Sequence, residues 1–359
     1  MRLPPLHRAQ TRKPALPLML LLLWLLAGCT PVRPPLEQRL AALVEQPDAP
    51  LAGLAVAVVA GDAVIYEGYW GNRRIAAAQA NLPVTAATRF RVASISKLVT
   101  ALGAMRLVEA GKLQLDRDIS DYLGFRLRNP HYPDRPITAR MLLSHTSSLR
   151  DAGAYIVPLP GLLQDLFDPA STPDAGGAHF APVQPGAYFL YANLNFGVLA
   201  TVMEAAAGER FDRYMQTAIL APLGIDGGYL LTDLARPSLA QLATLYTRQD
   251  ANGVWNAAGP WVAQFDHLSG GRPPAPRAVP HLGPHPASGE PAPAALLAAY
   301  QPGTNATIFA PHAGLRISAR DLAKIVLLLL QEGRYAGEQL ISPITVRRML
   351  REQWRYDPQ

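Results

Sequence analysis

Cysteine and lysine are scarce in this sequence of 359 residues, and their scarcity excludes several kinds of site. Cys29 is the single cysteine, so the chain cannot form an internal disulfide and contains no C-x-x-C pair of the zinc-finger type. The H-E-x-x-H pattern of zinc hydrolases and the G-x-x-x-x-G-K loop of nucleotide-binding proteins are also absent. We therefore predict neither a metal ion nor an organic cofactor.

Charged residues are also few, at 17% of the chain, and the formal net charge is +6. Removal of an N-terminal segment that holds Arg2, Arg8, Arg12 and Lys13 would reduce this charge to +2. So small an excess, without runs of Lys or Arg mixed with aromatics, argues against a nucleic-acid partner. Hydrophobic residues make up 49% of the chain, which is enough to bury the core of one large domain or of two lobes.

The first 28 residues have the pattern of a secretory signal peptide. A basic start is followed by an apolar run over residues 15–26, which is too short for a comfortable membrane span. The run ends in L-A-G-C at residues 26–29, which resembles the lipobox where bacterial lipoproteins are cleaved and acylated. We expect residues 1–28 to be removed and Cys29 to carry lipid. Because Thr30 rather than Asp follows, we expect an outer-membrane anchor facing the periplasm.

The next part of the chain is predicted to contain a tether and then a β-hairpin. Residues 29–49 form the tether, with one short helix over residues 36–45 between two prolines. Residues 51–60 and 63–70 are apolar, partly β-branched runs on either side of Gly61-Asp62. That pattern is typical of two antiparallel strands joined by a tight turn.

The rest of the chain is mostly helical by its apolar periodicity. A buried helix is predicted over residues 94–110, because apolar residues recur at helical spacing and Gly111 is a suitable C-terminal cap. Further helices are predicted over residues 138–144, 194–207, 210–219, 319–331 and 343–351. Residues 250–302 are rich in Pro, Gly and Ala without any period, which indicates a long surface excursion within a domain that covers residues 50–359.

Ser94 and Lys97 could together perform nucleophilic catalysis. Their spacing places a hydroxyl and an amine on one face of a helix, within reach of each other. Serine needs a base, and a buried lysine can lose its proton whereas arginine cannot. The chain has four lysines against 29 arginines, so a lysine at this position runs against the bias of the composition. By itself S-x-x-K also fits a capped helix with a solvated lysine.

Three stretches of the sequence, the first of which contains Ser94 and Lys97, resemble motifs of a known protein family. Residues 90–97, FRVASISK, resemble the first motif of the penicillin-recognising serine hydrolases, which include class C β-lactamases, D-alanyl-D-alanine peptidases and related esterases. Residues 137–149, ITARMLLSHTSSL, are similar to the family's IT-x-x-x-LL-x-HTSGL stretch, with Ser148 in place of the usual glycine. Residues 185–193, PGAYFLYAN, match the Y-x-N motif and its PG-x-x-F lead-in.

The resemblance implies a fold and a set of roles. The fold is α+β of the β-lactamase/transpeptidase type, with an antiparallel sheet flanked by helices and a mainly helical lobe. Ser94 would be the nucleophile, Lys97 its activating partner, and Tyr191 the group that passes a proton between Ser94 and the leaving group. Asn193 would bind Lys97 and the substrate amide. His145 is tempting as a general base, but in the family this segment forms the wall beside the site.

The third motif of the family, K-T-G or H-x-G, is not found in its usual place. Residues 312–314, HAG, fit H-x-G literally, but the sequence through residue 323 resembles the GGL-x-ST-x-x-DLA start of a helix, so His312 is not expected to be catalytic. In that alignment the third motif and the later strands of the sheet would lie beyond Gln359. We therefore expect a truncated chain with unpaired strand edges at residues 51–70 and poor stability.

The function predicted from the sequence is that of a lipid-anchored serine hydrolase that forms an acyl-enzyme on amide or ester substrates. A β-lactam, a D-Ala-D-Ala-like peptide and an ester all stay open, because such enzymes differ in loop shape and water placement rather than in the nucleophile. The alternative is a catalytically inactive lipoprotein that binds cell-wall peptides, or a truncated pseudoenzyme. Expected partners are a small-molecule or peptide substrate and outer-membrane lipid through acylated Cys29. The sequence does not define the oligomeric state.

Overall fold

A computed structural model describes residues 34–75, 80–168, 175–231, 234, 236–266 and 294–356. The predicted signal peptide and Cys29 lie outside the described residues. The chain divides into two compact units, residues 1–43 and 44–359, and the sheet, the core and the candidate site belong to the second. The predicted tether helix is present as α2 (Leu36–Val44). None of the described helices combines the length and the apolar character that a bilayer crossing requires.

The predicted hairpin is confirmed as an antiparallel pair of strands, β1 (Gly53–Ala60) and β2 (Ala63–Arg74). Gly61 forms the turn at a φ of +60°, a left-handed conformation that glycine adopts without steric cost. The short strand β3 (Leu82–Pro83) pairs with the far end of β2, which gives the strand order β1-β2-β3. Within the described residues, the other edge of β1 has no partner strand.

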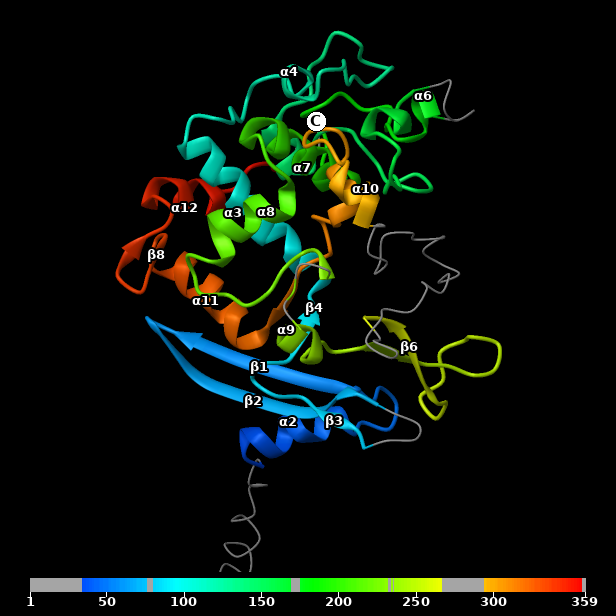
Figure 1. The fold of residues 1–359 in the computed structure, drawn as a ribbon, viewed down its shortest axis with the longest axis vertical. Helices are drawn as coiled ribbons and strands as arrows, with labels where there is room; N and C mark the ends of the chain where they lie inside the picture. The colour runs from blue at the N-terminus through cyan, green and yellow to red at the C-terminus, as the bar shows by residue number, and fades with distance from the viewer. Residues whose placement is uncertain are drawn as a thin grey trace, which may run out of the picture. The chain divides into compact units, whose positions relative to one another are not determined.

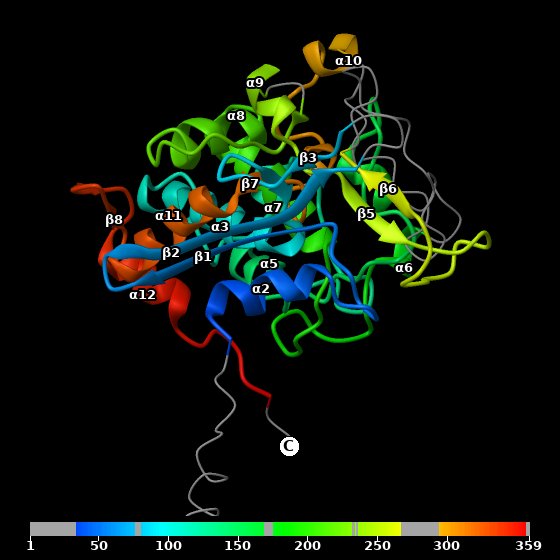
Figure 2. The same ribbon diagram turned by 90° about the horizontal axis from the view of Figure 1, so that it is seen from below.

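Helix α11 (Ala319–Leu330) packs against both long strands of this sheet (Figure 1). It begins where expected because Ser318 caps it: the Ser318 Oγ accepts a hydrogen bond from the Asp321 N–H at 3.0 Å. Ile325 and Leu328 lie on its buried side. Figure 2, seen from below, shows the two strands running across α11. The hairpin is therefore covered by a helix on at least one face.

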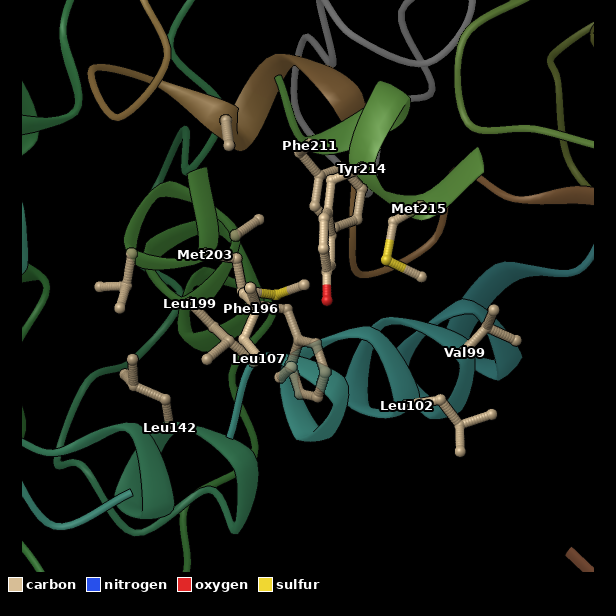
Figure 3. Packing of buried hydrophobic residues seen from close by; sticks show 14 of the residues in the cluster. Val99, Leu102, Leu107, Leu142, Phe196, Leu199, Met203, Phe211, Tyr214 and Met215 are labelled. Atoms are coloured by element: carbon tan, nitrogen blue, oxygen red, sulfur yellow. The ribbon is translucent and has the colours of Figure 1, made fainter. Parts of the chain in front are cut away.

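Much of the hydrophobic core lies among three helices, α3 (Ser96–Glu109), α7 (Leu194–Ala207) and α8 (Phe211–Met215). In Figure 3, Phe211 and Tyr214 of α8 point toward the side chains of α7 and α3. The Tyr214 hydroxyl donates to the Gly103 carbonyl of α3 at 2.9 Å, so this buried polar group is satisfied. α7 ends at Ala207 as predicted because Gly208, at a φ of +78°, forms the left-handed C-cap.

Short elements connect these larger ones. Each of them is two to eight residues long, and two begin at a Ser or Thr cap: α5 at Thr138 and α12 at Ser342. They are β4 (Arg89–Arg91), η1 (Ala93–Ile95), α4 (Ser120–Leu123), α5 (Ala139–Leu143), η2 (Leu163–Leu166), α6 (Ala175–Ala178), the π-helical turn η3 (Gln216–Leu220), α9 (Arg236–Ala240), β5 (Leu245–Arg248), β6 (Trp261–Phe265), α10 (Ala294–Ala298), η5 (Ala306–Phe309), β7 (Arg316–Ser318), β8 (Arg334–Tyr335), β9 (Glu338–Gln339) and α12 (Pro343–Leu350).

The prediction that residues 250–302 form an irregular surface excursion is wrong in part. Strand β6 lies inside this range and pairs with β5 in an antiparallel hairpin, and α10 forms near its end. Asp266 is buried in an ion pair with Arg316, whose Nε and Nη2 donate to its two carboxylate oxygens at 3.1 and 2.7 Å. The partner of Asp266 is 50 residues away in sequence, so local composition gave no sign of this contact.

Strands β4 and β7 form a second antiparallel pair that positions the start of α3. Phe90 pairs with Ile317, so the segment just before Ser94 lies beside the segment just after residue 314. The Val92 N–H donates to the Leu315 carbonyl at 3.0 Å, and the Leu315 N–H donates to the Ser96 Oγ at 3.1 Å. Residues from two distant parts of the chain therefore meet at the N-terminal end of α3.

Candidate active site

Ser94 lies on a tight turn directly before α3. The sequence predicted an α-helix from Ser94 onward, but the structure has a 3₁₀ turn, η1, before α3 begins at Ser96. Ala93 adopts a φ of +44°, which is unfavourable for a residue with a Cβ. Ser94 is exposed, and its Oγ lies 2.8 Å from the Tyr191 hydroxyl oxygen. The predicted nucleophile and the predicted proton carrier are thus in direct contact.

Lys97 lies beneath Ser94 and is only 7% exposed. Its Nζ donates to the Ser94 Oγ at 3.2 Å, to the Asn193 Oδ1 at 2.8 Å and to the His312 carbonyl at 3.1 Å. These acceptors satisfy the three protons of an ammonium group. Burial lowers the pKa of Lys97 from its ordinary value, while hydrogen bonding to Tyr191 opposes that effect. The amine is therefore shifted toward the neutral form that a general base requires.

His145 holds the segment that carries Tyr191. Its carbonyl accepts the Leu190 N–H at 2.8 Å, and its Nδ1 accepts the Ala192 N–H at 3.3 Å. Its ring stacks on the Tyr191 ring with 4.4 Å between centroids. Burial, followed by the charge of Lys97, lowers the pKa of His145 to about 4. A neutral imidazole with its Nδ1 occupied fits the wall role expected from the sequence, rather than that of a general base.

Asn193 connects Lys97 to a carboxylate that the sequence analysis missed. The Asn193 Nδ2 donates to the Asp151 Oδ2 at 2.9 Å and to the Tyr155 hydroxyl at 3.4 Å. Its carbonyl oxygen faces Lys97, as the resemblance implied. The further role of Asn193 toward a substrate amide stays a prediction. The one sequence signal for Asp151 was an acidic residue two positions after the HTSSL stretch.

His312 is brought to the site by its backbone rather than by its ring. Its carbonyl accepts from Lys97, while its ring packs edge-on against Tyr155 at 5.3 Å between centroids. The residues after it enter β7 and then α11, in line with the predicted start of a helix. Within the described part of the chain, no three His, Cys, Asp or Glu side chains are grouped as metal ligands would be.

Comparison with known proteins identifies the family. Residues 40–355 match the model of the Beta-lactamase family, which covers most of the chain. The chain belongs to the beta-lactamase family. The predicted α+β fold of the β-lactamase/transpeptidase type is thereby confirmed. Among solved structures, this family member is similar to an octameric penicillin-binding protein homologue from Pyrococcus abyssi, with a TM-score of 0.61 and 21% identity over 90% of this chain and 61% of that one.

The curated relatives have names that include both peptidases and esterases. This beta-lactamase family member is 29% identical over 186 residues to penicillin-binding protein 4 of Amycolatopsis lactamdurans, which is 50% of this chain and 47% of that protein. It is 27% identical over 178 residues to the D-alanyl-D-alanine-carboxypeptidase/endopeptidase AmpH of Escherichia coli, which is 48% of this chain and 44% of that protein. It is 30% identical over 195 residues to esterase EstB of Burkholderia gladioli, which is 51% of this chain and 48% of that protein. The matched region spans about half the length of such relatives.

Proposed function

We propose that this protein is a serine hydrolase that cleaves an amide or ester through an acyl-enzyme on Ser94. One observation carries the proposal: the exposed Ser94 Oγ lies 2.8 Å from the Tyr191 hydroxyl and 3.2 Å from the Lys97 Nζ. A nucleophile needs a base within hydrogen-bond reach, and here two candidate proton acceptors are in reach at once.

In the acylation step, the Ser94 Oγ forms a bond to the substrate carbonyl carbon while its proton passes to neutral Lys97, directly or through Tyr191. The bond from that carbon to the leaving nitrogen or oxygen then breaks, and Tyr191 delivers the proton to the leaving group. In the second step, water adds to the acyl carbon, the bond to Ser94 Oγ breaks, and Ser94 recovers its proton. Lys97 is neutral again at the end of the cycle.

The start of the helix supports the charge that develops during attack. Ser94 lies in η1, directly before α3, where the helix N-terminus favours negative charge. Lys97 is in contact with Tyr191 as well, with its Nζ 4.8 Å from the centre of the ring. Such an arrangement favours a reaction in which one proton is shared among Ser94, Tyr191 and Lys97.

The substrate is a β-lactam, a D-Ala-D-Ala-like peptide or an ester. The names of the relatives include penicillin-binding proteins, a carboxypeptidase and an esterase, which is consistent with any of the three. The retained contacts of Ser94, Lys97 and Tyr191 favour an active enzyme over the alternative of an inactive cell-wall peptide-binding lipoprotein.

Intact-mass spectrometry tests this proposal. The protein and its Ser94→Ala variant would each be exposed to a β-lactam and to a fluorophosphonate. The proposal predicts a covalent mass increase in the wild-type protein that is absent from the variant. No adduct with either reagent, or equal adducts in both proteins, would contradict it and favour the binding-protein alternative.

We also propose that the protein is anchored in the cell envelope through lipid on Cys29, with its hydrolase unit facing the periplasm. The support is the apolar run over residues 15–26 and the L-A-G-C sequence that follows it. Labelling of growing cells with an alkyne-bearing fatty acid would modify the protein and leave a Cys29→Ser variant unmodified. Equal labelling of both proteins would contradict the anchor.

A further inference from the structure

The carboxylate of Asp151 lies at the N-terminus of α7 and accepts three hydrogen bonds. Its Oδ2 accepts from the Asn193 backbone N–H and from the Asn193 Nδ2, each at 2.9 Å, and its Oδ1 accepts from the Leu194 N–H at 2.9 Å. Asp151 is exposed and belongs to the loop that follows the HTSSL stretch. It therefore touches both the backbone and the side chain of the residue that contacts Lys97.

These contacts determine which end of the Asn193 amide faces Lys97. A primary amide has an accepting oxygen and a donating nitrogen, and a rotation of the group exchanges the two. A carboxylate accepts but does not donate, so Asp151 binds the nitrogen end. The oxygen end is thereby directed to Lys97, where the Nζ-to-Oδ1 distance is 2.8 Å. An amide turned the other way would present two donors to the ammonium group.

The charge of Asp151 acts on the same lysine. Burial lowers the pKa of Lys97, and the Asp151 carboxylate is one of the groups that raise it again. In the described part of the chain, few titratable groups surround Asp151 and Lys97, and the charge of Asp151 affects several of them. They are Tyr191, in contact with Lys97; His145, whose pKa burial and then the charge of Lys97 lower; Tyr155, whose pKa burial and then Asp151 raise against Arg91; and His179, whose pKa burial lowers while Asp151 raises it against Arg150.

We propose that Asp151 is a positioning residue of the site: it holds Asn193 with its carbonyl on Lys97 and thereby keeps Lys97 against Ser94. The inference extends the proposed hydrolase function to a residue that touches neither the substrate nor Ser94. The competing explanation is that Asp151 only caps α7, since a carboxylate at a helix N-terminus stabilises the helix in any case. The two explanations differ in what happens at Lys97.

A lysine titration tests the effect of the Asp151 charge on Lys97 without any assay of activity, and kinetics then separate the two explanations. The full chain has four lysines, so protein labelled with ¹³C at the lysine Cε gives few signals, and a Lys97→Arg variant identifies that of Lys97. In Asp151→Asn, the loss of the carboxylate charge should move the titration midpoint of Lys97 to lower pH. The midpoints of the other lysines should stay in place. An unchanged Lys97 midpoint in Asp151→Asn would overturn the inference.

Kinetics supply the second readout. If acylation requires neutral Lys97, the acid limb of kcat/KM in Asp151→Asn moves to lower pH through the loss of charge alone. Asp151→Ala also removes the acceptor that holds Asn193, so its plateau should fall by about 10- to 100-fold because the lysine is less well placed. Ser342→Ala is the matched control, since it removes the N-cap of α12 outside the site and should lower thermal stability alone. An Asp151→Ala variant that loses only stability, as this control does, would contradict the proposal. Absence of Ser94-dependent turnover in the wild-type protein would reject the proposed hydrolase, while an unchanged Lys97 midpoint in Asp151→Asn would reject the inference about Asp151.

Discussion

Helix α7 and the β1–β2 hairpin are both rich in apolar residues, but they are buried to very different extents. Every residue of α7 from Leu194 to Glu204 is buried. In the two long strands, Gly68 is the one residue that reaches that level, and Ile65 is 63% exposed. Two residues of the site are positioned by the buried helices rather than by the hairpin. Asn193 directly precedes α7, and Lys97 lies on α3, which packs against α7.

The difference teaches that apolar composition alone does not specify burial. Strand β1 has the sequence GLAVAVVA, which is apolar on both faces and typical of a strand covered on both sides. Within the described residues its covering is incomplete, and Val58 is 38% exposed. The helices α3, α7 and α8, by contrast, cover one another. We therefore expect the catalytic geometry to depend on the helical core far more than on the hairpin.

The largest effect should come from Lys97, a buried charged residue on α3. Lys97→Arg keeps a positive charge but removes the base, because a guanidinium does not lose its proton near neutral pH. The rate of Ser94 acylation should fall on the order of 10²- to 10⁴-fold. Lys112→Arg, at an exposed position in the turn that follows α3, is the matched control and should keep the rate of the wild-type protein. Measurement of acylation by a reporter ester checks both, and similar rates in Lys97→Arg and wild type would contradict the role.

A pair of truncations compares the stability of the two regions. Phe211 is fully buried, with its ring edge-on to Tyr229 at 4.8 Å between centroids. Phe211→Ala should lower the free energy of unfolding by about 3–5 kcal/mol through lost contacts and a cavity. Val58→Ala, in the partly exposed strand, should cost less than about 1 kcal/mol. Urea unfolding measures both, and equal losses would break the contrast between core and hairpin.

Glu204 at the end of α7 should make stability depend on pH. Burial raises the pKa of Glu204 to about 7, even though the Tyr300 hydroxyl and the Gly303 and Phe211 N–H groups donate to it. From pH 4.5 to about 7 the unfolded chain releases this proton while the folded chain keeps it. The free energy of unfolding should therefore fall as pH rises through this window, by up to about 3 kcal/mol.

Glu204→Gln removes the titrating group and should reduce this pH dependence. The comparison must be made with wild type at each pH, because His145, whose pKa is lowered to about 4, contributes a change of the opposite sign between pH 4 and 6.5. Urea unfolding at several pH values gives the difference. The same slope in both proteins would show that the Glu204 carboxyl does not titrate in this range.

A small effect is expected at Ser148, which occupies the position of the usual glycine in the HTSSL stretch. Its φ is +69°, and its buried Oγ accepts from the Asn129 Nδ2 at 2.9 Å. Ser148→Ala loses this hydrogen bond and keeps the unfavourable φ, which should cost about 1 kcal/mol. Ser148→Gly loses the bond but relieves the φ, so the Gly variant should be the more stable of the two by about 1 kcal/mol. Equal thermal midpoints for both would contradict this account.

Much of the helical core could be predicted from the sequence because its signals are local. Ser318 and Gly208 mark the start of α11 and the end of α7, and the apolar periodicity between such caps needs no knowledge of distant residues. The contact of Ser94 with Lys97 follows from their three-residue spacing. The 3₁₀ turn under Ser94 was missed, since it depends on Ala93 and on the pairing of β4 with β7.

The rest of the site depends on contacts between distant residues, which the sequence does not display. Asp151 reaches Asn193 across 42 positions, and Lys97 reaches the His312 carbonyl across 215. Neither contact produces a pattern in composition or periodicity. The ion pair of Asp266 with Arg316 was missed for the same reason, because it crosses from a Pro-rich segment to a core strand.

The position of the acyl group after a quenched reaction tests the central claim most directly. Trypsin cleaves after Arg91 and Lys97, so residues 92–97 form one peptide that contains both Ser94 and Ser96. Fragmentation of that peptide, after brief exposure to a reactive ester or β-lactam and acid quenching, separates the two serines. The account predicts the acyl mass on Ser94, which is exposed, and not on Ser96, whose Oγ is buried and accepts the Leu315 N–H. Acylation of Ser96 or of another residue, with Ser94 unmodified, would contradict it.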